Sequence, residues 1–130
     1  MICVDSDVII DFLRGKKDAI DLLGKYSGQI YTTEINIFEI FDGIYSQKQI
    51  NKREMELASA FFKHMPLLSS QQGWGHKSAQ ILSALMKQGK EIEEKDCFIL
   101  GTMAVNGCNK VITGNVKHYS ATPGIQVISY

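Results

Sequence analysis

The chain has 130 residues, 45% of them hydrophobic, and its 14 basic and 14 acidic residues give a formal net charge of zero. This length suits one domain with a full core, so we expect residues 1–130 to form a single domain. Zero net charge argues against strong, sequence-independent binding of nucleic acid, which needs many phosphate contacts, but allows a local basic patch. No stretch approaches the roughly 18 apolar residues of a membrane span, so no membrane association is expected.

Strands alternate with helices along the chain. Apolar periodicity, caps and stop signals predict, in chain order, a strand at 1–5, helices at 7–14 and 17–26, a strand at 29–32, helices at 34–46 and 51–64, a short strand at 66–68, helices at 72–88 and 94–106, and strands at 110–113 and 125–128. This alternation favours a parallel sheet with helices on both faces. The predicted fold class is α/β: a three-layer α/β/α sandwich around a mostly parallel central sheet.

The N-terminus and the cysteines indicate a cytoplasmic protein. No basic region precedes the first apolar run, and Asp5 interrupts that run, so we expect no signal peptide. Cys3, Cys97 and Cys108 lie in apolar contexts without metal-ligand spacing. We expect all three to be reduced thiols in the core.

Four residues place an oxygen ligand where a strand ends or where an apolar helix should bury it. Asp5 ends the first strand, Glu39 lies inside an apolar helical run, Asp96 opens the last long helix, and Asn115 follows a strand. Each has an ordinary structural explanation: helix capping for the aspartates, a boundary position for Glu39 and an Asx turn or N-cap for Asn115. Asp7 suits a capping role better than Asp5 does, because it is closer to the first helical turn.

These four residues are expected to converge, because the carboxyl ends of parallel strands share one edge of the sheet. Clustered carboxylates repel one another unless a cation neutralises them, and oxygen ligands favour Mg²⁺ or Mn²⁺ over zinc. We therefore predict Asp5, Glu39 and Asp96 as metal ligands and catalytic residues. Asn115 is predicted as a fourth catalytic residue, either a neutral ligand or a group that positions water. Such a site can activate water against a phosphodiester.

Other catalytic groups are not evident. The sequence has no glycine-rich phosphate loop, no Gly-x-Ser-x-Gly elbow and no Cys/His pattern for nucleophilic catalysis. His64, His76 and His118 lack ligand spacing, and we interpret them as surface or core residues. Arg14 and Lys117 are the best candidates for contacting a phosphate.

Four short motifs, in order, resemble those of PIN-domain nucleases. They are Val4-Asp5-Ser6-Asp7-Val8-Ile9-Ile10, Thr33–Ile40 with Glu39, Asp96–Gly101, and Val111–Tyr119 with Asn115, and Pro123-Gly124-Ile125 is similar to the closing turn and strand. Stand-alone PIN proteins of this size are mostly VapC-type toxins of prokaryotic toxin–antitoxin modules. The resemblance therefore implies an Mg²⁺-dependent endoribonuclease with an RNA substrate. Three positions depart from the family pattern: Asn115 stands where many members have Asp, Asp7 where Asn or Ser is usual, and Gly101 where Ala is frequent.

The resemblance also implies partners: a homodimer and an antitoxin protein that binds a groove between the helices of residues 34–62. Five aromatic residues in this region, Phe38, Phe41, Tyr45, Phe61 and Phe62, exceed the obvious needs of a small core. They could equally fill the core, because aromatic residues dominate both cores and interfaces.

Two other functions remain open. A haloacid-dehalogenase-type phosphatase would use Asp5-Ser6-Asp7, but Ile9 stands where that family has Thr, and the chain is short for a cap domain. A non-catalytic PIN-like module would bind RNA or protein without cleaving it. The intact Asp5, Glu39 and Asp96 count against this second alternative.

Overall fold

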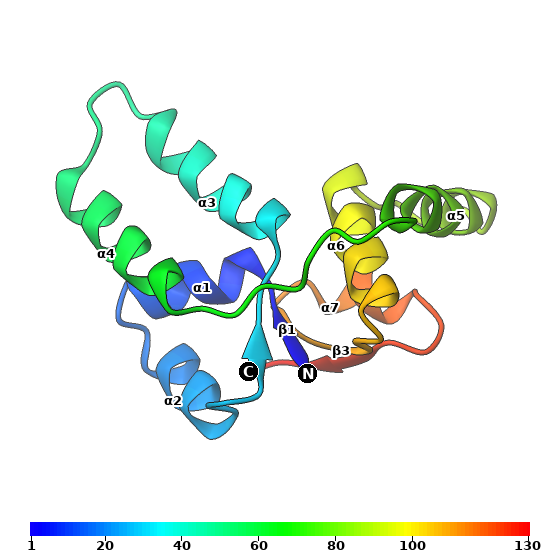
Figure 1. Ribbon diagram of the computed structural model, residues 1–130, viewed down its shortest axis with the longest axis horizontal. Coiled ribbons are helices and arrows are strands. Elements are labelled where there is room, and N and C mark those ends of the chain that lie inside the picture. Colours follow the sequence, from blue (N-terminus) through cyan, green and yellow to red (C-terminus); the bar gives the residue numbers. More distant parts are fainter.

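The computed structural model describes residues 1–130 (Figure 1). Its strands and helices, in chain order, are β1 (Ile2–Val4), α1 (Ser6–Leu13), α2 (Lys17–Lys25), β2 (Ile30–Tyr31), α3 (Glu34–Tyr45), α4 (Lys52–Lys63), α5 (Trp74–Lys87), α6 (Glu94–Val105), β3 (Lys110–Ile112), α7 (Val116–Ser120) and β4 (Gln126–Ile128). The strands pair in the order β2-β1-β3-β4, and every pairing is parallel. The predicted α/β fold class is confirmed, and the sheet is wholly rather than mostly parallel.

Alternate residues of the central strands serve two separate cores. Ile2, Val4 and Ile112 pack in one cluster with residues of α1 to α4, whereas Cys3 and Val111 pack in the other with residues of α6. Side chains of a strand point alternately to opposite faces, so each central strand contributes to both clusters. Figure 1 shows the corresponding division, with α1 to α4 on one side of the sheet and α5 to α7 on the other. The sheet is therefore covered on both faces, as expected.

Two predicted features differ from the structure. Residues 66–68 form only an isolated bridge between Leu67 and Thr32, in which Leu68 N donates to Thr32 O and Thr32 N donates to Pro66 O. The prediction of a strand there is wrong, because Pro66 has no N–H to extend the ladder. Helix α7 was not predicted, since five residues are too few to show a helical period.

Gly101 lies where α6 packs closely against α5, which the sequence alone does not show. A Cβ at this residue of α6 would lie 1.9 Å from Ser78 Oγ and 2.9 Å from the carbonyl oxygen of Trp74, both on α5. The absence of a side chain thus allows the two helices to pack closely. Glycine at this position, where the family frequently has Ala, therefore has a role in helix packing.

The three cysteines are buried, as expected. Burial raises the pKa of the Cys3 thiol well above its ordinary value and raises that of Cys97 to about 11. None of the helices combines the length and the apolar character that crossing a bilayer requires.

Candidate functional site

Asp5 lies directly after β1 and is the N-cap of α1. Its Oδ1 accepts hydrogen bonds from the Ser6 amide (2.8 Å) and from Asn36 Nδ2 (3.1 Å), and its Oδ2 accepts from Thr113 Oγ1 (2.7 Å). Only 3% of the residue is exposed, and this burial raises the pKa of the carboxyl despite the three donors. Capping accounts for one of these bonds but not for the two that come from other elements.

Asp5 occupies the N-cap position of α1, and Asp7 in the first turn satisfies another of the free amides of this helix, as expected. Asp7 Oδ1 accepts from the Val8 amide and its Oδ2 from the Gly114 amide, at 2.8 Å and 2.7 Å. Asp7 therefore ties the start of α1 to the loop that follows β3. Burial, with Asp5 adding like charge, raises the pKa of Asp7 as well.

Glu39 reaches the same region from α3. Its Oε1 accepts from Ser6 Oγ at 2.8 Å, and burial raises the pKa of its carboxyl, with Asp5 and Asp96 adding to the effect. The capping box of α3 contributes through Asn36. Thr33 and Asn36 bond reciprocally, and the fully buried Asn36 amide donates to Asp5 and to Ser6, which in turn donates to Glu39.

Asp96 lies in the first turn of α6, but its carboxylate does not cap that helix. The N-cap is Glu93, which makes no side-chain capping bond, and Asp96 Oδ2 lies 2.9 Å from Nδ1 of His118 on α7. Burial raises the pKa of Asp96, while the His118 contact opposes that rise. Our interpretation of His118 as an unremarkable surface or core residue is therefore wrong.

Asn115 is the N-cap of α7, yet its side chain makes no capping hydrogen bond, so the Asx-turn explanation is not supported. Its backbone amide donates to Thr113 Oγ1 at 3.0 Å, and that hydroxyl in turn donates to Asp5. The amide side chain is left exposed beside the carboxylates.

One cavity of about 340 Å³ brings the four predicted site residues together. It is lined by Asp5, Ser6, Asp7, Ile10, Glu39, Glu93, Asp96, Asn115 and His118. Neither Arg14 nor Lys117 is among these residues; Arg14 instead lines a neighbouring groove that also includes Glu39. The cavity has a strongly acidic lining, with His118 as its sole basic side chain.

Asp5, Glu39 and Asp96, hereafter the three candidate ligands, leave acceptor capacity free toward the cavity. Glu39 Oε2 and Asp96 Oδ1 accept no hydrogen bond from the protein, and Asp5 Oδ2 accepts only one. No three His, Cys, Asp or Glu side chains lie close enough together to enclose a metal ion. This arrangement still fits Mg²⁺, which keeps several of its waters and needs only one or two carboxylates directly.

Sequence reasoning missed four residues that hold the candidate ligands in place: Ser6, Asn36, Thr113 and His118. Two of them could have been recognised from the sequence. Asn36 occupies the position that completes a capping box with Thr33, and His118 follows Asn115 by one helical turn. The contacts of Ser6 and Thr113 depend on residues distant in the sequence and leave no local signal.

Comparison with known proteins identifies the family. The family described as PIN domain matches residues 2–122, and no curated protein sequence is significantly similar to the chain. One chain of the DNA-bound VapBC structure from Salmonella typhimurium superimposes with a TM-score of 0.86 at 18% identity, covering 98% of this chain and 96% of that one. A chain of Rickettsia felis VapBC2, bound to a promoter DNA fragment, gives 0.84 at 14% identity with 100% and 99% coverage. A chain of VapBC-1 from nontypeable Haemophilus influenzae gives 0.82 at 18% identity with 99% and 98% coverage. At these identities the structures establish a shared fold, and the match over residues 2–122 shows that the chain belongs to the PIN domain family.

Proposed function

We propose that this protein is a divalent-metal-dependent endoribonuclease and the toxin of a toxin–antitoxin module. The observation that carries the proposal is the acidic cavity, where all three candidate ligands keep an oxygen available for a cation. Membership of the PIN domain family and the fold shared with VapBC structures support it. Mg²⁺ or Mn²⁺ would be held by Asp5, Glu39 and Asp96, with one or two of these carboxylates binding directly and the rest through the waters that the cation keeps.

When bound, such a cation supplies Lewis acidity and lowers the pKa of a water molecule. Asp5, which is nearly buried and fixed by three donors, is the most rigid of the candidate ligands. Glu39 and Asp96 each leave one carboxylate oxygen free at the cavity, so either can accept a hydrogen bond or a proton from that water. Asn115, whose side chain is free of other bonds, can orient that water. Ser6 is the only hydroxyl side chain in the cavity lining, and its Oγ already donates to Glu39 and accepts from Asn36. We therefore assign Ser6 a role in holding Glu39, and attack on the phosphodiester to water.

A groove beside the cavity supports an antitoxin partner. It has a volume of about 200 Å³ and is lined by Ile10, Leu13, Arg14, Glu39, Ile40, Gly43, Ile44, Gln47, Glu54 and Leu57, from α1, α3, α4 and the adjoining turns. Half of these residues are hydrophobic, and Ile10 and Glu39 also line the acidic cavity. A peptide segment bound in this groove would therefore end next to the candidate ligands.

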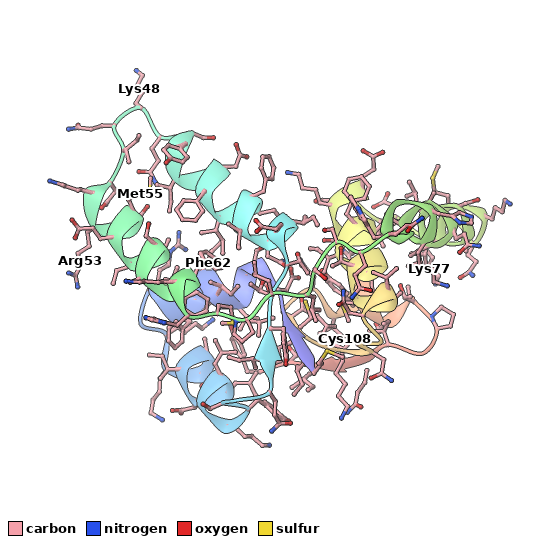
Figure 2. All side chains as sticks on the ribbon, in the orientation of Figure 1. Lys48, Arg53, Met55, Phe62, Lys77 and Cys108 are labelled. Atoms are coloured by element: carbon pink, nitrogen blue, oxygen red, sulfur yellow. The ribbon has the colours of Figure 1, made fainter.

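The aromatic residues of α3 and α4 divide into two groups. Phe41, Phe61 and Phe62 pack against the first core cluster, whereas Phe38 and Tyr45 on α3 are 55% and 61% exposed. Figure 2 shows Met55 and Phe62 along α4, with Lys48 and Arg53 projecting outward near the α3–α4 connection. Phe38 and Tyr45 are seven residues apart and share one face of α3. We propose this face as the homodimer contact.

Cleavage of RNA in Mg²⁺, in Mn²⁺ and in EDTA tests the enzymatic proposal. The Asp96→Asn variant should fold normally and lose most of its cleavage, because Asn keeps the size of the side chain and removes the charge. Glu94→Gln is a matched control: Glu94 is an exposed carboxylate in the same helical turn and does not line the cavity. Wild-type cleavage by Asp96→Asn would refute the catalytic role. Binding of RNA without cleavage by the wild type would favour the non-catalytic module, and cleavage of a generic phosphate ester alone would favour a phosphatase.

A further inference from the structure

The segment from Thr113 to His118 contacts three acidic side chains of the cavity. Thr113 Oγ1 donates to Asp5, the Gly114 amide donates to Asp7, and His118 Nδ1 pairs with Asp96. Helix α7, which begins in this segment, is anchored by Tyr119, which is fully buried in the second core cluster with Ile99 and Leu100 of α6. This anchor sets the rotation of α7 and so fixes the direction in which the neighbouring His118 points.

The contact between His118 and Asp96 is the only hydrogen bond that the Asp96 carboxylate makes with the protein. An ionised carboxylate can only accept, so the shared proton belongs to Nδ1 of the imidazole. The Asp96 side chain is 8% exposed and the His118 side chain 32%, and both line the cavity, which places the pair at its wall rather than on the open surface. The bond occupies Oδ2 and leaves Oδ1 free.

We propose that His118 is a positioning residue that orients Asp96 for binding a divalent cation. The inference rests on the proposed function, in which Asp96 is a metal ligand. Without His118, no hydrogen bond from the protein would fix the rotation of the Asp96 carboxylate, and the free oxygen would be held less firmly in its direction. Partners that hydrogen-bond to a ligating carboxylate orient it in this way, and their removal typically costs about 10- to 100-fold in metal affinity or activity.

Titration of Mn²⁺ into the metal-free protein by calorimetry tests the inference independently of catalysis. His118→Ala should weaken Mn²⁺ binding by about 10- to 100-fold. His118→Asn should recover most of the affinity, because its amide nitrogen is attached to Cγ, as Nδ1 is. His118→Gln should recover less, since one further methylene group displaces the amide. Val116→Ala, at an exposed position of the same helix outside the cavity lining, is the matched control and should bind Mn²⁺ as the wild type does.

The outcomes separate this inference from the proposed function. If the wild type binds Mn²⁺ and His118→Ala binds it equally well, the positioning role is wrong while the metal site stands. Equal loss in the Ala, Asn and Gln variants would also overturn it, because His118 would then act as a direct ligand. If the wild type binds no Mn²⁺, the proposed function fails and this inference fails with it. A thermal melt of each metal-free variant shows whether the fold is intact. If His118→Ala does not fold, the Mn²⁺ affinities of His118→Asn and His118→Gln decide: the inference requires tighter binding by the Asn variant.

Discussion

Replacing Thr113 with Val removes a hydroxyl that connects the end of β3 to Asp5. Thr113 is fully buried, donates to Asp5 Oδ2 at 2.7 Å and accepts from the Asn115 amide at 3.0 Å. Valine has nearly the same shape, so the substitution removes two hydrogen bonds without creating a cavity. We expect it to destabilise the fold and to weaken cation binding at Asp5.

The size of the effect follows from these two bonds. A hydrogen bond to a charged group contributes about 1.5 to 3 kcal/mol and a neutral one about 0.5 to 1.5 kcal/mol. Asp5 borders the cavity, so water can replace part of the lost donor, and we expect the lower end, about 2 kcal/mol. An unfolding entropy of roughly 2.1 cal/mol/K per residue over this chain converts 1 kcal/mol into about 4 °C. The melting temperature should therefore fall by about 8 °C.

Thermal unfolding followed by circular dichroism, in EDTA and without added metal, measures this change. Thr102→Val is the matched control, because Thr102 is equally buried but donates only to the Phe98 carbonyl within its own helix, at 2.8 Å. That bond duplicates the helical hydrogen bond, so the control should cost less than about 1 kcal/mol. Equal melting temperatures for the two variants would refute the argument that Thr113 supports Asp5.

Three further results are expected. Gly101→Ala should lower the melting temperature, since overpacking against Ser78 costs about 1 to 3 kcal/mol and the helix propensity of Ala returns about 1 kcal/mol; an unchanged melt would contradict the close approach of α5 and α6. The three candidate ligands have pKa values that are raised in the folded protein, so above about pH 4 the folded chain keeps protons that the unfolded chain has released. The free energy of unfolding of the metal-free protein should therefore fall as the pH rises above about 4. Mn²⁺ should restore more stability at pH 8 than at pH 5, as urea titrations across that range would show. Exchanging Phe38 and Tyr45 for Ser should leave a monomer in light scattering if the exposed face of α3 is the dimer contact, whereas a persistent dimer would locate the contact elsewhere.

The amino-acid sequence by itself determined the fold class and most of the secondary structure. Apolar periodicity and caps are local properties, so the long helices α3 to α6 and the strands β1, β3 and β4 were predicted to within about two residues at each end, the usual uncertainty of element boundaries. The candidate ligands were predicted for the same reason: a carboxylate that interrupts an apolar run is visible without the fold. Helix α7 was missed because it is shorter than two helical turns.

Only the tertiary structure decided what each polar side chain does. Whether Asp96 caps α6 or faces a cavity depends on His118, 22 residues away, and Asp5 is held by Asn36 and Thr113, 31 and 108 residues away. A capping carboxylate and a ligating one look alike in sequence, because both occupy the first turn of a helix. They differ in the partners that other elements bring to them, and the parallel pairing of β1 with β3 and the anchoring of α7 by Tyr119 are what supply those partners.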